Sequence, residues 1–290
     1  MRFGLSTHLY HADRLDREHL VEIAAHDFEA VEVFATRTHF DYHDPEAVTA
    51  LAEWLDDTRL ILSSMHAPIC ASLVDGIWGE TYSTAIADDG RRRRALAETE
   101  AALNVARTIP YPFLVVHLGV PGTDARGDNS RDAARRSLDE LQRMAEAVNV
   151  RVALEVIPNP LSAATALVRL IEEELDAPNL GICLDIGHAR LMGDPIDAIE
   201  ACSGHLVTTH LHDNQGRTDD HLVPFEGIID WEAALLALQK IGYEGAWMFE
   251  VANTGSTSSV LERTSRARRR FEALLAQGLP DGWSADDADI

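Results

Sequence analysis

The sequence predicts a closed (β/α)₈ barrel that forms a single domain. Eight short apolar runs rich in Val, Ile, Leu and Phe alternate with longer amphipathic stretches along the whole chain. A doubly wound open sheet is the alternative, but no GxGxxG motif opens the first helix. The 290 residues agree with the barrel, because such barrels often run to about 200–250 residues or more as one domain.

The eight apolar runs are predicted to be buried parallel strands, because strands covered on both faces are apolar without alternation. They are Arg2–His8, Ala30–Phe34, Leu60–His66, Phe113–Leu118, Arg151–Val156, Leu180–Asp185, Leu206–His212 and Ala246–Val251.

The stretches between them carry apolar residues three and four positions apart, which is typical of amphipathic helices. Asp precedes both Pro45 and Pro195, as expected for a capping residue followed by proline at the first helical position. The predicted helices are Leu15–His26, Pro45–Asp57, Arg91–Arg107, Arg131–Val148, Ser162–Leu175, Pro195–Ala201, Trp231–Ile241 and Ser258–Gln277.

Three predicted loops are long: Ala67–Gly90, Gly119–Ser130 and Asp213–Asp230. Loops beyond about 12 residues in a compact domain usually carry function. We expect the barrel to occupy residues 1–278, and residues 279–290 to form an acidic, exposed tail.

The charge balance argues against some partners. The chain has 48 acidic and 25 basic residues, a formal net charge of −23 that repels nucleic acid and anionic lipid. The longest basic run, Arg91–Arg94, is expected to open a helix and to pair with acids.

No signal peptide, long apolar run or CxxC spacing is present, so we expect a cytoplasmic protein that is not attached to a membrane. A GC-rich genome and a salt-adapted surface remain open explanations of the acidity.

Side chains that can bind metals stand at the C-terminal ends of six predicted strands, where a barrel places its active site. They are His66, His117, Glu155, Asp185 with His188, His210 with His212, and Glu250, and the seventh loop adds Asp219 and His221. Gathering these groups without a cation would be costly. Mixed oxygen and nitrogen ligands without thiolate suit Mn²⁺, Zn²⁺, Co²⁺ or Mg²⁺. The sequence therefore predicts a divalent metal site.

The motifs that carry these groups resemble the xylose isomerase-like TIM barrel family, which also contains the type IV apurinic/apyrimidinic endonucleases. They are His66-Ala-Pro, Leu-Glu155-Val, Leu-Asp185-Ile-Gly-His188, His210-Leu-His212-Asp-Asn and the stretch Glu226–Trp231. The resemblance covers nearly the whole chain, but these motifs do not separate the branches of the family.

The sugar isomerase and epimerase branch implies one divalent metal, held by Glu155, Asp185, His210 and Glu250. It also implies that Glu155 and Glu250 transfer protons on opposite faces of the sugar, with the metal stabilising an enediolate. In that case His188, Arg217 and His66 would hold substrate oxygens.

The endonuclease branch implies three zinc ions. The first ion would be bound by His66, His117 and Glu155, and the second by Glu155, Asp185, His210 and Glu250, so that Glu155 is shared. The third ion would be bound by His188, Asp219 and His221. Such a cluster favours phosphoester hydrolysis, whereas the acidic charge opposes DNA binding.

We expect a metal-dependent isomerase or epimerase of a small sugar or polyol ketone. A trinuclear hydrolase and a non-catalytic metal-binding barrel are the alternatives, and metal content per chain would separate one ion from three.

Other residues are less informative. Glu32 and His8 could contact substrate or make structural hydrogen bonds, and Trp78 could stack on a sugar, cap the core or contact another subunit. We expect His212 at the rim of the mouth, the three cysteines in the core, and the following on the surface: His11, His19, His26, His39, His43 and His205. Family members are often oligomers, but neither oligomeric state nor substrate identity follows from the sequence.

Overall fold

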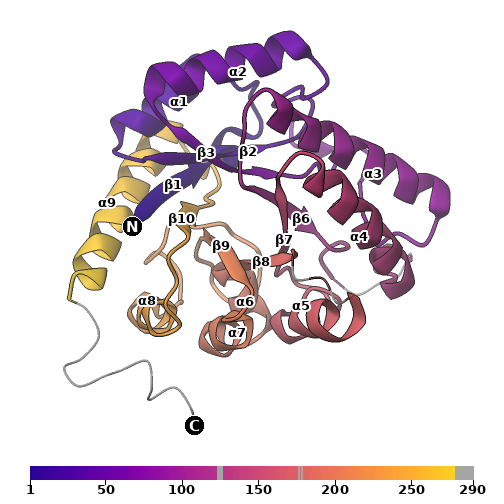
Figure 1. Ribbon diagram of the computed structural model, residues 1–290. Helices are drawn as coiled ribbons and strands as arrows, with labels where there is room; N and C mark the ends of the chain where they lie inside the picture. The colour runs from indigo at the N-terminus through magenta and orange to yellow at the C-terminus, as the bar shows by residue number, and fades with distance from the viewer. Residues whose placement is uncertain (123–126, 176, 178, 278–290) are drawn as a thin grey trace.

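The predicted barrel is confirmed by the structure, a computed structural model that describes residues 1–122, 127–175, 177 and 179–277. Among these residues, parallel strands close in the order β1-β10-β9-β8-β7-β6-β3-β2 (Figure 1). Every one lies inside a predicted run, with ends within two residues of those expected. The barrel strands are β1 Arg2–Ser6, β2 Ala30–Phe34, β3 Ile61–His66, β6 Phe113–His117, β7 Arg151–Glu155, β8 Gly181–Asp185, β9 Leu206–Leu211 and β10 Ala246–Phe249.

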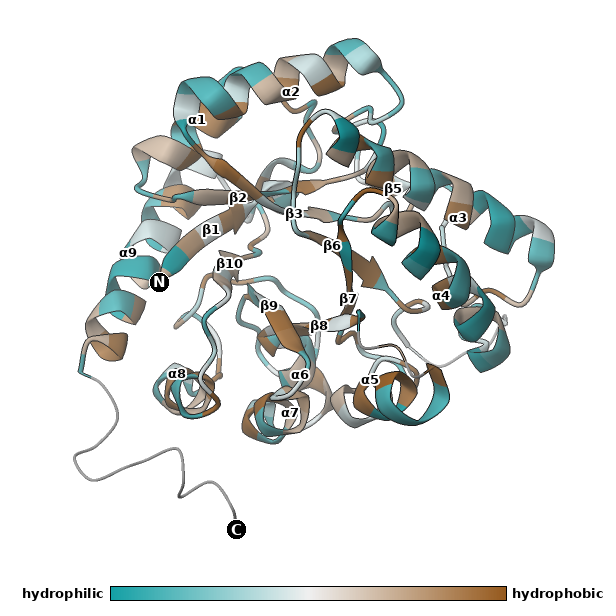
Figure 2. Ribbon diagram, viewed as in Figure 1, coloured by the Kyte–Doolittle hydropathy of each residue, from teal (hydrophilic) through white to brown (hydrophobic). Residues whose placement is uncertain are grey.

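Helices surround the strands and turn their apolar sides towards them (Figure 2). Asp44 and Asp194 accept hydrogen bonds from the first turns of their helices, as predicted. The bounds are α1 Arg17–Ala25, α2 Pro45–Thr58, α3 Asp89–Asn104, α4 Arg131–Glu146, α5 Ala164–Arg169, α6 Ile186–Met192, α7 Pro195–Cys202, α8 Trp231–Lys240 and α9 Thr257–Leu275. A π-helical turn over Leu170–Leu175 completes the predicted fifth helix.

Helix α6 was not predicted. It begins directly after the last residue of β8, because the Asp185 side chain accepts a hydrogen bond from the His188 backbone N–H at 2.6 Å. An Asp at a strand end can also cap a helix, and here it does both. The short helix places His188 back over the mouth of the barrel.

The register of the sheet brings the ligand candidates to one level. His117 pairs with Glu155 on the neighbouring strand, and Asp185 pairs with His210. Two residues earlier on three strands, Val115, Ala153 and Cys183 form a small apolar cluster apart from the main core. Side chains two apart share a face of a strand. Small apolar residues therefore fill the barrel directly below the polar mouth.

The loop between β3 and α3 contains a hairpin that was also not predicted. Its strands β4, Leu73–Val74, and β5, Ile77–Trp78, are joined by Asp75 and Gly76, both with positive φ. Asp-Gly is the preferred pair for such a tight turn. The hairpin exposes apolar side chains, with Ile77 73% and Trp78 50% exposed.

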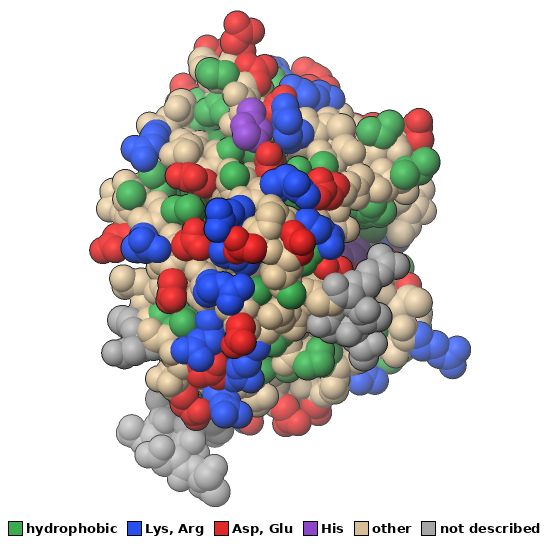
Figure 3. Space-filling model, turned by 90° about the vertical axis from the view of Figure 1, so that its right-hand side faces the viewer, with side chains coloured by type: hydrophobic (Ala, Val, Ile, Leu, Met, Phe, Trp, Pro, Cys, Tyr) green, Lys and Arg blue, Asp and Glu red, His purple; other side chains and the backbone are tan. Residues whose placement is uncertain are grey.

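The basic run Arg91–Arg94 lies in the first turns of α3 and pairs with acids, as expected. Figure 3 shows the side of the molecule where α3 and α4 lie, and acidic and basic side chains are intermixed over it. The pairs are Arg91 with Asp128, Arg92 with Asp89 and Glu140, Arg93 with Asp89, and Arg94 with Glu80.

Within the described ranges, no helix combines the length and the apolar character needed to cross a bilayer. The three cysteines are buried, as expected. The predicted acidic tail, residues 279–290, lies outside the described residues, and the domain boundary at 278 stays a prediction.

Candidate active site

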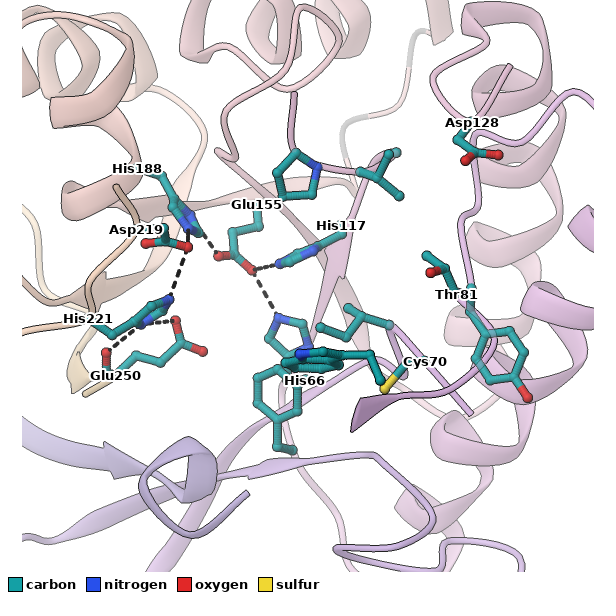
Figure 4. A pocket seen from close by; sticks show the side chains of 17 residues that line it. His66, Cys70, Thr81, His117, Asp128, Glu155, His188, Asp219, His221 and Glu250 are labelled. Carbon is teal, nitrogen blue, oxygen red and sulfur yellow. Dashed lines mark hydrogen bonds and ion pairs between the residues drawn. The ribbon is translucent and has the colours of Figure 1, made fainter. Parts of the chain in front are cut away.

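A cavity of about 610 Å³ opens at the C-terminal mouth of the barrel. Strand ends and the loops that follow them line it, and Figure 4 shows how the labelled side chains point into it. Its volume falls within the roughly 300–1,000 Å³ typical of small-molecule sites. Asp185 and His210 are not among the lining residues, whereas the other predicted ligands are: His66, His117, Glu155, His188, Asp219, His221 and Glu250.

Four predicted ligands form one buried cluster, which we call the inner group: Glu155, Asp185, His210 and Glu250. Their ligand atoms all lie within 4.8 Å of one another. His210 Nδ1 is central, 3.3 Å from Glu155 Oε1, 3.3 Å from Glu250 Oε2 and 3.9 Å from Asp185 Oδ2. Three carboxylates and one imidazole that converge in this way can hold a divalent ion.

Two atoms of the inner group support this fit directly. Glu155 Oε1 and His210 Nδ1 are buried and have no hydrogen-bond partner. A buried polar atom without a partner costs about 1–3 kcal/mol, so such atoms are rare in folded proteins. Both belong to the inner group and face each other. A divalent cation between them would complete the coordination of both atoms.

Glu32 holds His210 from below. Glu32 is fully buried in β2, and its Oε2 lies 3.1 Å from His210 Nε2. Ser6 and Ser64 donate hydrogen bonds to the same carboxylate, at 3.1 and 2.7 Å. This arrangement orients the ring so that Nδ1 faces the inner group, which is a common way to position a metal-binding histidine. Of the two roles left open for Glu32, the structure supports the structural hydrogen bond.

The ionisation of the inner group is strongly coupled. Burial by itself would raise the pKa of Glu155, but the His117 and His210 imidazoles hold that pKa well below its usual value. Burial also opposes charge on His210, yet Cys183 and then Glu250 raise its pKa well above the usual value. In the metal-free protein, protonated imidazole therefore balances the carboxylates. A divalent ion bound by His210 would have to displace that proton.

His66 and His117 contact the other oxygen of Glu155. Their Nε2 atoms lie 3.1 and 3.0 Å from Glu155 Oε2. Phe34 stacks on the His66 ring, with the centroids 4.0 Å apart. The two oxygens of Glu155 thus serve different partners: Oε2 meets two histidines, and Oε1 faces the inner group.

A second cluster, which we call the outer group, consists of His188, His212, Asp219 and His221. Asp219 Oδ2 lies 3.0 Å from His188 Nε2 and 3.2 Å from His221 Nε2. Burial would raise the pKa of Asp219, but the hydrogen bonds from His188 and His221 lower it. Burial lowers the pKa of His221, but Asp219 outweighs this effect and raises it to about 9.

The expectation that His212 lies at the rim is wrong. Its side chain is fully buried, and Nε2 lies 2.9 Å from Asp185 Oδ1. The ring fits inside because residue 187 is a glycine. A Cβ there would lie only 2.1 Å from His212 Cε1. Orientation by Asp213 is limited to its backbone carbonyl, 3.5 Å from His212 Nδ1, because the Asp213 side chain accepts hydrogen bonds from Trp231 Nε1 and nearby backbone N–H groups.

Two histidines expected on the surface are buried instead. His11 is 4% exposed and its Nε2 lies 2.8 Å from Thr36 Oγ1, and His39 is fully buried beside Thr7 Oγ1. Burial lowers their pKa values to about 2 and about 4, so both are neutral. They connect the loops that follow β1 and β2, a long-range contact that no local pattern signals. The other four histidines are exposed or partly exposed, as expected.

Three further candidates lie apart from the inner group. Arg217 is exposed and is not among the described residues that line the cavity. His8 contacts His221, with ring centroids 4.6 Å apart, and its Nδ1 lies 3.3 Å from the Val251 carbonyl. Trp78 belongs to the hairpin and lines the cavity, so its position is compatible with stacking on a ligand.

Known proteins share this architecture. The chain is 28% identical over 261 residues to uncharacterized protein MJ1311 of Methanocaldococcus jannaschii, covering 87% of this chain and 84% of that protein. It is 25% identical over 276 residues to the L-ribulose-5-phosphate 3-epimerase UlaE of Salmonella paratyphi A, covering 91% and 90%.

Two solved structures are similar over nearly their whole length. A D-tagatose 3-epimerase-like protein has a TM-score of 0.79 at 25% identity, with 96% of this chain and 99% of that chain covered. The IolI protein, solved with a binding zinc atom, has a TM-score of 0.77 at 16% identity, covering 97% and 100%. The model of the family described as xylose isomerase-like TIM barrel matches residues 20–276. The predicted resemblance is thus confirmed, and the chain belongs to the xylose isomerase-like TIM barrel family.

Proposed function

We propose that this protein is a divalent-metal-dependent isomerase or epimerase of a small sugar or related polyol ketone. The observation that carries the proposal is the inner group, with Glu155 Oε1 and His210 Nδ1 buried and unpartnered beside two further carboxylates. Mn²⁺ and Zn²⁺ suit this ligand set, and Co²⁺ or Mg²⁺ fit the same chemistry. The sugar epimerases among the relatives and the zinc in the IolI protein support the same assignment.

Glu155 and Glu250 would transfer the protons. Both belong to the inner group and also line the cavity, so they are the members that can meet metal and substrate together. One carboxylate would remove the proton next to the substrate carbonyl, and the other would return a proton. A bound divalent ion would supply electrostatic stabilisation of the negative charge that develops on the substrate.

His66 and His188 would hold substrate oxygens, because both line the cavity next to Glu155. Both ring nitrogens of His188 have partners, Nδ1 the Val156 carbonyl and Nε2 Asp219, so a substrate oxygen would have to replace one of these contacts. The family resemblance also implies a substrate role for Arg217, but its position outside the cavity lining gives this role no support.

A trinuclear phosphoesterase of the endonuclease IV type is the second candidate. The observation that favours it is the presence of three potential metal-binding groups, which together include all nine predicted ligands. The pairing within the outer group and the net charge of −23 weigh against it. Incision of a DNA duplex at an abasic site, lost in His221→Ala, would support this candidate.

Solvent deuterium exchange tests the first candidate. The Mn²⁺-loaded protein is incubated with ketoses in D₂O, and the label in the recovered sugar is measured by mass spectrometry. We expect Glu155→Gln and Glu250→Gln each to lower the exchange rate by about 10²–10⁴-fold, the usual contribution of an acid–base group. Glu200→Gln, an exposed site on α7, is the control and should match the parent. Parental exchange in either active-site variant would refute the proposed roles.

Elemental analysis of protein purified without chelators or affinity metals addresses the number of ions. About one ion per chain is expected for the proton-transfer chemistry. Close to three zinc ions per chain would favour the phosphoesterase, and phosphoester substrates would then be tested first.

A further inference from the structure

The cavity has two chemically different ends, and we infer that its substrate is a keto-sugar that carries an apolar or aromatic aglycone and no phosphate group. This inference rests on the proposed function, because it assumes that the sugar ring is held next to Glu155 and Glu250. The inference goes beyond the proposed function because it specifies which substituent the sugar ring carries.

Most of the charged groups of the cavity gather at one end, and Asp128 is the exception. In Figure 4, His188, Asp219, His221 and Glu250 lie together on one side of the cavity, whereas Cys70 and Thr81 lie on the opposite side. The lining residues away from the inner group are mainly apolar or aromatic: Ile69, Cys70, Trp78, Tyr82, Val120 and Pro121. They come from the loops after β3 and β6, two of the long loops predicted to carry function.

The size of the cavity calls for more than one sugar ring. Its volume of about 610 Å³ lies in the middle of the range for sites that enclose drug-sized ligands. A sugar ring at the polar end would leave the wall around Ile69 and Tyr82 in contact with water. An apolar substituent on the ring would displace that water favourably, because transfer of apolar surface out of water stabilises a complex.

Trp78 is the side chain best placed to contact such a substituent. It lines the cavity from the hairpin and is 50% exposed, so part of the ring is open to a ligand. Backbone pairing with Leu73 and an edge contact with the His11 ring, 5.4 Å between centroids, hold it in place. A rigid, half-exposed indole offers a large contact area to an aromatic group.

The charge of the lining opposes a phosphate group. Four carboxylates line the cavity, Asp128, Glu155, Asp219 and Glu250, and no Arg or Lys is found among the lining residues in the described part of the chain. One metal ion and the histidines offset this charge only at the polar end. A phosphate dianion at the other end would meet apolar side chains and Asp128, and the described cation beside Asp128, Arg91, is already paired with that carboxylate at 3.4 Å.

Binding of three matched ligands tests the inference independently of turnover. The ligands are 3-keto-D-glucose, its 6-phosphate and phenyl 3-keto-β-D-glucopyranoside, titrated into the Mn²⁺-loaded protein by calorimetry. We expect the phenyl glycoside to bind at least about tenfold tighter than the free sugar, and the phosphate at least about tenfold weaker. Trp78→Ala should abolish the advantage of the phenyl glycoside and leave the free sugar unchanged.

Ile77→Ala is the matched control, since Ile77 is exposed in the same hairpin but does not line the cavity. It should keep the parental order of affinities. The inference would be overturned if the three ligands bound equally, if the phosphate bound more tightly than the free sugar, or if the phenyl glycoside did not bind. It would also be overturned if Trp78→Ala kept the tighter binding of the phenyl glycoside. If the expected order holds but no ligand exchanges deuterium, the binding preference stands and the proposed isomerase chemistry fails, and with it the role of the glycoside as substrate.

Discussion

The inner and outer groups are both built from acids and histidines, three acids and one histidine in the first and one acid and three histidines in the second, but they differ in how their atoms are satisfied. The inner group lies on strand ends, is almost fully buried and leaves Glu155 Oε1 and His210 Nδ1 without partners. The outer group has its acid, Asp219, on a loop with a side chain that is 38% exposed, and this acid already contacts two histidines. This difference supports the proposal that a cation binds in the inner group, whereas the acid of the outer group already has its hydrogen-bond partners.

This difference shows that a complete set of metal-binding residue types does not fix the number of ions. Glu155 marks the division, because Oε2 contacts His66 and His117 while Oε1 faces the inner group and has no hydrogen-bond partner. The pairing of each atom, and not the count of His and Asp, favours a single ion. The same acid-to-amide substitution made once in each group can test this conclusion.

The largest expected effect separates the two groups by metal affinity. Glu250→Gln, in the inner group, should weaken Mn²⁺ or Zn²⁺ binding by at least about 100-fold, because a direct ligand matters at least as much as its supporting partners. Asp219→Asn, in the outer group, makes the same chemical change in the same cavity and should alter affinity less than about threefold. Titration against a competing chelator measures both. Loss of one of several bound ions in Asp219→Asn would contradict a single-ion centre.

A smaller loss is expected when the support of the inner group is removed. Glu32→Gln keeps the shape of the side chain but weakens its contact with His210 Nε2. The dissociation constant of the metal should rise by about 10–100-fold. Glu98→Gln is the matched control, because Glu98 also accepts from a histidine, His43, but away from the cavity. Unchanged affinity in Glu32→Gln would show that Glu32 does not position His210.

The outer group should affect the pH dependence of the metal-free protein. The pKa of His221 is about 9 in the folded state, since Asp219 outweighs burial, and about 6.5 when unfolded. The stabilisation is therefore fully present below about pH 6.5 and is lost as the pH rises through about 9. At pH 6, His221→Gln should lower Tm by about 2–4 °C, equivalent to about 1 kcal/mol, and this difference should shrink by pH 9.5.

Calorimetry in the presence of a chelator measures this effect. His43→Gln is the control, because His43 makes a similar contact with Glu98 at an exposed position, where ion pairs contribute little. A difference in Tm between His221→Gln and the parent that grows with pH would contradict the assignment.

The smallest expected effect concerns Arg217. This exposed side chain belongs to neither group and lies outside the cavity, so Arg217→Ala should raise KM by no more than about threefold. Arg190→Ala, outside the cavity lining and on α6, is the comparison. A much larger rise in KM for Arg217→Ala alone would show that the loop after β9 brings Arg217 to the substrate, as the family resemblance implies.

The sequence predicted most of the barrel because parallel strands are apolar on both faces and their order follows the chain. It also marked all four members of the inner group as possible metal ligands, since each stands near the end of an apolar run, and the family resemblance grouped these four. Glu32 carried a weaker signal, a single acid within the apolar strand Ala-Val-Glu-Val-Phe. Its role could not be assigned, because it depends on a contact with His210, 178 residues away in the chain.

The errors have the same origin. His11, His39 and His212 were placed on the surface or at the rim because histidine carries no periodic signal of burial. Their partners Thr36, Thr7 and Asp185 come from other elements. The space for His212 depends on the missing side chain of Gly187, on α6. Such packing follows from tertiary structure and leaves no mark in local sequence.

The cross-strand pairing of His117 with Glu155 and of Asp185 with His210 has a consequence for assembly. A slip of one residue between neighbouring strands would turn these side chains to the opposite face of the sheet. A barrel closed in the wrong register could still bury many apolar residues, but it could not gather the inner group. An ion that binds the correct register alone would shift the equilibrium towards it. Metal supply during synthesis would then act as a proofreading step for barrel closure.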